Sequence, residues 1–286
     1  MTFQPVPLEI QASPWAARRA RARELRERHP FAGELLTLYL ALLPVQEDAW
    51  SAVRESPPEL ARLPRWAAAR VVPAVVQATV ASGPAALGDA ARAHLATGAV
   101  SDALARWLAG EELGAVERYL ARASLAPVLE ALGERAGAAC AAPRDAAGST
   151  CPCCGGAPQV SYIAATGESL VSGGRSLLCA RCGSSWACSR STCPACGERG
   201  ESRLTTYAES FSGAVSGNGA GDADAQPMFP HLRIAGCETC RRYLIEVDLQ
   251  RDARAVPEVD ELAALPLDLH AVEQGLTKVT PNLMGF

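Results

Sequence analysis

CPCCG at residues 151–155 is the first of four Cys-x-x-Cys pairs in this chain. The other pairs lie in CARCG at residues 179–183, CPACG at 193–197 and CETCR at 237–241. Eleven cysteines placed at random would give about 0.4 pairs of this spacing, so four pairs are a specific signal. A tight turn places both sulfurs of a pair on one side of an ion, and two turns complete a tetrahedron. The pattern therefore predicts two four-cysteine metal sites.

The predicted ligands are the eight paired cysteines: Cys151, Cys154, Cys179, Cys182, Cys193, Cys196, Cys237 and Cys240. Sequential pairing is the simplest arrangement, because each half then resembles a zinc ribbon or a rubredoxin, in which two turns clamp one ion at the end of a small sheet. The alternative joins the two inner pairs, which only ten residues separate, and leaves the outer pairs to each other. Spacing alone does not distinguish zinc from iron, since both accept tetrahedral sulfur.

Glycine follows the second cysteine in three of the pairs, at Gly155, Gly183 and Gly197. Glycine readily takes a positive φ, which points backbone N–H groups at the sulfurs. The fourth pair departs from this pattern, because Arg241 and Arg242 follow it. A divalent ion held by four thiolates carries a net charge of about −2. We therefore expect these arginines to offset that charge.

Composition narrows the class of protein. The chain has 286 residues, 49% of them hydrophobic, and a formal net charge of −4. This balance argues against a protein dominated by contacts to a phosphate backbone, which usually needs a strongly basic surface. The first ten residues lack the features of a secretory signal, and the longest apolar run, at 35–43, is too short to cross a bilayer. We therefore expect a cytoplasmic location with no membrane partner, where crowded cysteines indicate metal thiolates rather than disulfides.

The expected fold class is α+β, with an all-helical N-terminal domain, two rubredoxin-like or zinc-ribbon units and a C-terminal helix. The expected divisions are a helical domain at 1–136, a linker at 137–150, a first metal unit at 151–192, a second metal unit at 193–250, and a C-terminal helix and tail at 251–286. Apolar residues at helical spacing predict helices at Pro14–Glu27, Phe31–Leu43, Pro58–Ala69, Val72–Ala81, Leu87–Leu95, Ser101–Ala109, Gly114–Leu132 and Val259–Gln274. Alternating patterns predict strands at Gln159–Ala164, Ser176–Leu178, Leu204–Glu209, Arg233–Ala235 and Tyr243–Asp248. The Gly- and Ser-rich residues 212–226 are expected to form a surface loop.

Several other residues are not expected to carry chemistry. Cys140, Cys153 and Cys188 are predicted to be spare thiols, with Cys153 pointing away from the first site. Isolated histidines are not expected to bind metal; they are His29, His94, His231 and His270. The arginine run at 18–28 favours a solvated or partner-facing helix surface over a nucleic-acid contact. The sequence contains no phosphate-binding loop, nucleophile elbow or recognisable catalytic triad, so nothing in it supports a hydrolase or a kinase.

The order of these motifs resembles that of the FdhE family, the formate dehydrogenase accessory proteins. The resemblance is carried by a helical first half, by Trp186 after the second pair, and by the arginine-flanked fourth pair that runs into Tyr243-Leu244. His29-Pro30, Gln46 and the C-terminal motifs Asp268-Leu269-His270, Gly275 and Asn282-Leu283 extend it.

The resemblance implies a cytoplasmic protein that is not an enzyme and is needed for active respiratory formate dehydrogenases. It implies contact with their catalytic subunit, which carries molybdenum or tungsten and selenocysteine or cysteine. It also implies rubredoxin-like iron sites, in which the eight paired cysteines are the ligands.

Three functions are compatible with the sequence. The first is a maturation or quality-control factor for formate dehydrogenase. The alternative is a zinc-ribbon module for nucleic-acid binding or transcription, against which the acidic balance weighs. A freestanding iron electron carrier is the third, but such a carrier would not need a helical half of this size.

Overall fold

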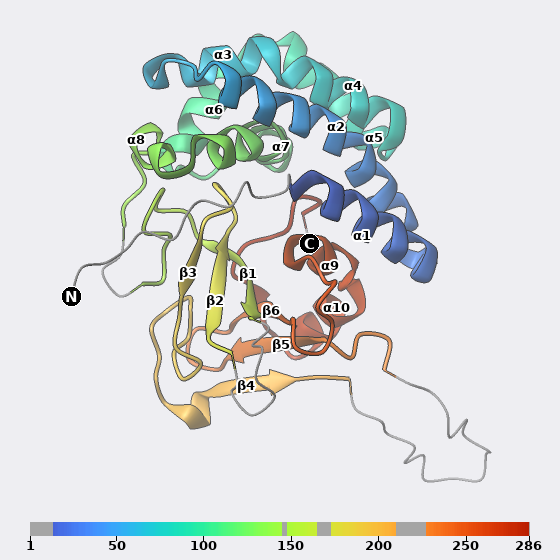
Figure 1. Cartoon of the computed structure of the whole chain (residues 1–286), viewed down its shortest axis with the longest axis vertical. Helices are drawn as coiled ribbons and strands as arrows, with labels where there is room; N and C mark the ends of the chain where they lie inside the picture. The colour runs from blue at the N-terminus through green and yellow to red at the C-terminus, as the bar shows by residue number, and fades with distance from the viewer. Residues whose placement is uncertain (1–13, 145–147, 165–172, 210–226, 286) are drawn as a thin grey trace.

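The computed structural model describes residues 14–144, 148–164, 173–209 and 227–285. A layer of helices covers one end of a mixed sheet, and two further helices lie beside the sheet (Figure 1). The predicted α+β class is therefore confirmed. The surface loop predicted at 212–226 lies outside the described residues. None of the described helices is long and apolar enough to cross a membrane.

The helical layer follows the predicted pattern of apolar residues closely. Its helices are α1 (Pro14–Arg28), α2 (Gly33–Glu55), α3 (Leu63–Arg70), α4 (Val72–Ser82), α5 (Ala85–Ala96), α6 (Val100–Ala109), α7 (Ala115–Leu132) and the short α8 (Ala136–Ala139). Helix α3 begins five residues after the predicted start, because the turn Leu60–Arg62 precedes it.

The predicted end of the second helix at Leu43 is wrong. Helix α2 continues through Pro44 to Glu55. A proline inside a helix removes one backbone hydrogen bond and costs about 3 kcal/mol. Burial on both sides of the proline offsets this cost: Leu42 and Leu43 are fully buried, and the Gln46 amide donates to the carbonyl oxygen of Ala123 in α7 at 3.1 Å.

The predicted C-terminal helix is also two helices rather than one. They are α9 (Pro257–Ala263) and α10 (Leu265–Glu273). Proline at position 266 explains the break, because it has no backbone N–H to continue the hydrogen bonds of α9 and it suits the first turn of a new helix.

One sheet joins the two predicted metal units. Its strands are β1 (Pro158–Ile163), β2 (Arg175–Cys179), β3 (Ser185–Ala187), β4 (Leu204–Tyr207), β5 (Leu232–Cys237), β6 (Arg242–Asp248) and β7 (Thr277–Lys278). The strand order is β3-β2-β1-β6-β5-β4, and β7 also pairs with β6. The parallel β1–β6 pair connects the halves, while each half is antiparallel within itself. The sequence pattern missed β3 and β7, which are too short to show a period.

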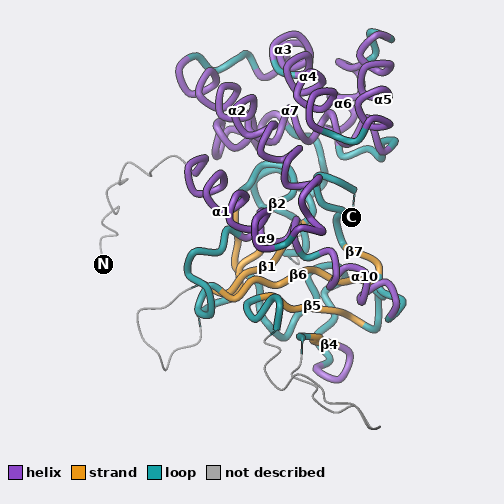
Figure 2. Tube along the Cα trace, turned by 90° about the vertical axis from the view of Figure 1, so that its right-hand side faces the viewer, coloured by secondary structure: helices purple, strands orange, loops and turns teal. Residues whose placement is uncertain are grey.

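Each of the two hydrophobic cores takes residues from both halves of the chain. The first core packs α2, α4, α6 and α7 around the cysteines of the first metal unit. In the second core, Trp15, Leu25 and Leu36 from the first two helices pack with β5, β6, α9 and α10. Figure 2 shows α1 lying against α9. The domain boundaries expected from the sequence stay predictions.

A buried ion pair fastens α1 to α9. The guanidinium of Arg21 donates to Asp260 at 2.9 and 2.5 Å and to Asp252 at 2.8 Å. His231 Nε2 lies 2.7 Å from the same Asp260 carboxylate. Arg21 and Asp260 are both almost fully buried. We expect Arg21→Met to lower the free energy of unfolding by about 3 to 5 kcal/mol, because it removes the guanidinium that balances the buried Asp260 carboxylate. Urea unfolding followed by circular dichroism measures this change.

Arg19→Met is the matched control, since Arg19 lies two residues away on α1 and pairs with Glu47 at a partly exposed site. Exposed pairs contribute at most about 1 kcal/mol. Equal losses in the two variants would contradict the importance of the buried pair.

Burial of His29 predicts a pH dependence of stability. Desolvation lowers the pKa of His29 below 6.5, and the charges of Arg28 and Arg21 lower it further. The unfolded chain therefore takes up the proton first as pH falls, and stability decreases below about pH 6.5 by up to about 1.4 kcal/mol per pH unit. We expect His29→Phe, whose ring still packs beside Phe31 and Phe229, to show a shallower decrease between about pH 7 and 5. Parallel curves for variant and wild type would exclude this contribution.

Candidate metal centres

The structure brings the eight paired cysteines together in two groups of four. Site I contains Cys151, Cys154, Cys179 and Cys182, and site II contains Cys193, Cys196, Cys237 and Cys240; in each group the sulfurs lie within 4.8 Å of one another. This confirms the sequential pairing and excludes the pairing of the inner turns.

The sulfur spacing is that of a metal-thiolate tetrahedron. Neighbouring sulfurs lie 3.7 Å and 3.4 Å apart in site I, and 3.8 Å and 3.9 Å apart in site II. Metal–sulfur bonds of about 2.3 Å give a tetrahedron whose edges are about 3.8 Å. Both groups could therefore hold a metal ion, and sulfur geometry of this kind suits zinc and iron alike.

Tight backbone turns position the sulfurs. Gly155, Gly183 and Gly197 have φ values of 71°, 69° and 76°. Each donates its N–H to the carbonyl oxygen of the first cysteine of its pair. The expected positive φ values are thus present, while the N–H groups that point at sulfurs include those of Gly156, Arg181 and Ala195. Gly156 was not singled out from the sequence, although a Cβ there would lie 2.9 Å from the sulfur of Cys179. The turn therefore needs a second glycine to leave room for the site.

Arg241 occupies the same left-handed position in the fourth turn, with a φ of 56°. Among the described residues it is the one non-glycine with a positive φ. Its guanidinium donates to the carbonyl oxygen of Gln274 at the end of α10. The strained turn at site II is therefore tied to the C-terminal helix.

The two sites differ in their exposure to solvent. All four cysteines of site I are buried. In site II, Cys196 is exposed and Cys240 is half-buried. Site I belongs to the core that includes the helical layer, whereas strand β4, which flanks site II, lies at the end of the sheet farthest from those helices (Figures 1 and 2). Another molecule can therefore contact Cys196 and Cys240 of site II, whereas the cysteines of site I are shielded.

Polar contacts join site I to the helices above it. The guanidinium of Arg181, between the two cysteines of the second pair, lies 5.2 Å from the ring centre of Trp107 in α6. Arg144 donates to the carbonyl oxygen of Cys153 at 3.0 Å. Such contacts, with the shared apolar core, make site I the junction between helices and sheet.

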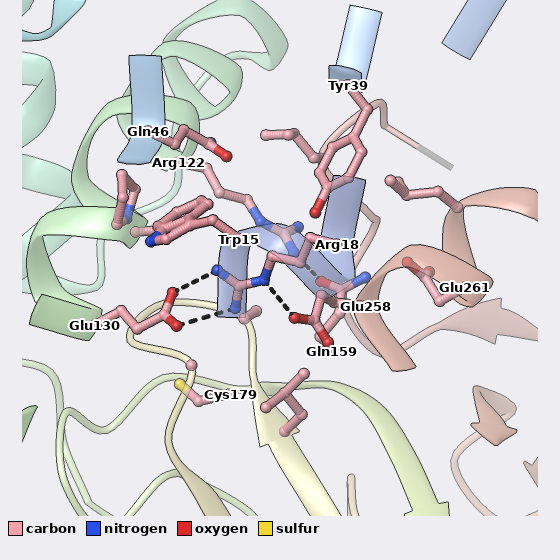
Figure 3. Close-up of a pocket in the computed structure, with 17 residues that line it drawn as sticks. Trp15, Arg18, Tyr39, Gln46, Arg122, Glu130, Gln159, Cys179, Glu258 and Glu261 are labelled. Atoms are coloured by element: carbon pink, nitrogen blue, oxygen red, sulfur yellow. Dashed lines mark hydrogen bonds and ion pairs between the residues drawn. The ribbon is translucent and has the colours of Figure 1, made fainter. Parts of the chain in front are cut away.

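A cavity of about 110 Å³ lies at this junction, beside Cys179. Figure 3 shows Arg18 between the carboxylates of Glu130 and Glu258, to which it donates at 3.0 and 2.8 Å. Burial lowers the pKa of Arg122, which also lines the cavity, to about 10. These charges link α1, α7 and α9 and leave no excess of positive charge, so the cavity is not an anion site.

Cys140 lies closer to site I than its isolated position in the sequence suggests. It is buried, and its thiol donates a hydrogen bond to the sulfur of Cys154. This bond and a second one from Cys151 lower the pKa of Cys154 to about 4, which favours the thiolate that a metal ion needs. No spacing signal could have revealed this contact, because Cys140 precedes the first pair by eleven residues.

The other spare residues lie away from both sites. The Cys153 thiol faces the carbonyl oxygens of Gly133 and Glu134, as expected, and Cys188 is half-buried. Within the described part of the chain, no histidine joins either cysteine group. His231 instead belongs to the ion-pair network of α1 and α9.

Known proteins that are similar to this chain are FdhE proteins. The family model for "FdhE, C-terminal domain" matches residues 220–284. A "Protein FdhE homolog" from Aquifex aeolicus is 32% identical over 136 residues, which is 48% of this chain and 41% of the relative. A second, from Pseudomonas putida, is 31% identical over 47% of this chain and 37% of the relative. The matched regions thus span less than half the length of these relatives.

The crystal structure of the FdhE protein from Pseudomonas aeruginosa is similar over the whole fold. The two share a TM-score of 0.64 and 24% sequence identity over 94% of each chain. A helical layer on a sheet that carries two four-cysteine groups defines a cysteine-rich protein with two candidate metal centres. Residues 220–284 match the C-terminal domain of FdhE, and the chain has the fold of the FdhE protein from Pseudomonas aeruginosa.

Proposed function

We propose that this chain is an accessory factor for formate dehydrogenase and holds one metal ion in each four-cysteine group. The observation that carries the proposal is the presence of two complete tetrahedral sulfur sets in an FdhE-type fold. All eight paired cysteines are the proposed ligands. The proposed role is maturation or quality control of the enzyme, without catalysis by the chain itself.

Iron is the proposed metal in both sites. Tetrahedral thiolates hold iron as well as zinc, and of these two metals only iron changes its oxidation state. The resemblance to the FdhE family favours iron. When bound, iron would supply one-electron redox chemistry, for which the exposure of Cys196 in site II gives a route. The cysteines hold the ion, and the backbone N–H groups of the turns stabilise the thiolate charge.

The catalytic subunit of formate dehydrogenase is the proposed partner, in the cytoplasm. Anaerobic purification from the native host tests this proposal directly, with metal analysis and identification of the proteins that co-purify. Two irons per chain and a formate dehydrogenase catalytic subunit are the expected result. Two zincs together with bound nucleic acid would support the zinc-ribbon alternative and reject the proposal.

A further inference from the structure

A cavity of about 200 Å³ opens on the face of the sheet opposite α9 and α10. Cross-strand register places Arg233, Leu244 and Glu246 on this face. Ile234 and Ile245, which alternate with them, pack into the second core on the other face. We name the cavity the arginine pocket after four of the residues that line it: Arg175, Arg190, Arg233 and Arg242.

The arginines of the arginine pocket outnumber the carboxylates that pair with them. Glu246 lies 3.3 Å from both Arg175 and Arg233, and Arg233 also reaches Asp248 at 2.8 Å. Arg190 and Arg242 have no carboxylate within 4.0 Å among the described residues. Two guanidinium groups therefore line the pocket without a carboxylate partner: Arg190 donates to the carbonyl oxygen of Gly173, and Arg242, within the described part of the chain, has only the thiolates of site II nearby. This arrangement favours an anionic occupant.

The floor of the pocket is apolar and its volume is small. Ile163, Leu204 and Leu244 line it, and Leu244 is fully buried. Sites for small molecules usually have volumes of about 300 to 1,000 Å³. A cavity of about 200 Å³ is better matched to one or two side chains of a docking polypeptide. In such a polypeptide, an acidic residue would pair with the guanidinium groups, and an apolar residue beside it would pack against the apolar floor.

The pocket also lies directly beside site II. Cys193 and Pro194 form part of its wall. A polypeptide seated there would be held against the more exposed of the two metal centres, where Cys196 faces solvent. The position therefore couples docking to access to the metal.

We infer that the arginine pocket is the docking site for an acidic segment of the partner protein. Binding of this segment in the pocket places the partner against site II. This inference rests on the proposed function, because the partner is taken to be the formate dehydrogenase catalytic subunit. Guanidinium groups supply the recognition, and the apolar floor supplies a contact that a free anion would not use.

Two binding measurements on the full-length, metal-loaded chain test the inference. The first measures the affinity of the purified catalytic subunit, and the second uses the anisotropy of a labelled twelve-residue peptide of alternating Glu and Leu. We expect Arg190→Glu to weaken both by at least about tenfold, because one charge-assisted contact is lost and a repulsion is added. Arg242→Gln should weaken both by a similar factor with its metal content intact. The control is Arg65→Glu on α3, which changes an exposed arginine remote in sequence from the pocket residues. It should change neither affinity.

The outcomes separate the two proposals. Tight binding of the catalytic subunit to wild type and to Arg190→Glu alike would overturn the arginine pocket and leave the proposed function standing. If wild type does not bind the catalytic subunit but binds the peptide, and Arg190→Glu does not bind the peptide, the catalytic subunit is rejected as the partner. The arginine pocket is then still supported as a site for acidic segments. Displacement of the peptide by millimolar inorganic phosphate alone would reduce the pocket to a site for small anions and overturn the inference.

Discussion

Replacement of Cys179 by serine is expected to release the ion of site I and to separate the helical layer from the sheet. Cys179 is buried, and its site forms part of the first hydrophobic core. A structural four-cysteine site contributes on the order of 10 kcal/mol to folding. The total stability of a domain is only about 5 to 15 kcal/mol. Loss of this ion should therefore remove most of the stability of the molecule.

Metal analysis and limited proteolysis measure this result. The Cys179→Ser variant should contain one ion per chain instead of two, and α6 and α7 should become accessible to protease. Cys153→Ser is the matched control, because this thiol lies inside the first turn but faces backbone oxygens outside the site. It should keep both ions. A folded, protease-resistant Cys179→Ser protein would show that packing alone holds the two layers together.

Replacement of Cys196 by serine is expected to change stability little but to abolish activation of formate dehydrogenase. Cys196 is exposed, and β4, which flanks site II, lies at the end of the sheet far from the helical layer (Figure 1). We therefore expect loss of the site II ion with little change in thermal unfolding of the helical layer. Activation of formate dehydrogenase should fall to the level of a strain without the chain, because the accessible centre is missing.

Metal content, the unfolding temperature and formate-dependent dye reduction in cell extracts provide the three readouts for this second variant. Cys188→Ser changes a half-buried thiol five residues before site II and serves as its control. Full activation by a one-ion Cys196→Ser protein would assign the function to site I or to the protein surface. Global unfolding would show that both ions are structural.

The local features of both sites could be predicted from the sequence, because the chemistry of a tight turn is contained in five residues. The φ values of Gly155 and Gly183 and the grouping of the eight cysteines follow directly from the spacing. The substitution of Arg241 for glycine was also visible, and the structure adds its anchor at Gln274.

The remaining features depend on contacts between residues far apart in the sequence. The parallel β1–β6 pair joins Ser161 to Glu246 and turns two expected units into one sheet. Continuation of α2 through Pro44 depends on packing against α7. Cys140, directly after α8, reaches site I through packing in the first core. No local period or motif reports such contacts, so they could not be predicted from the sequence alone.

The ion pair between Arg21 and Asp260 has a consequence for synthesis of the protein on the ribosome. Its partners lie 239 residues apart, so α1 emerges long before α9 exists. At about 5 to 20 residues per second, the interval is roughly 12 to 50 seconds. Throughout it, the apolar side of α1 around Trp15 and Leu25 can pack against α2 but not yet against α9 and the sheet. Site I is complete once Cys182 has emerged, so the nascent chain can take up its first ion before the second core closes.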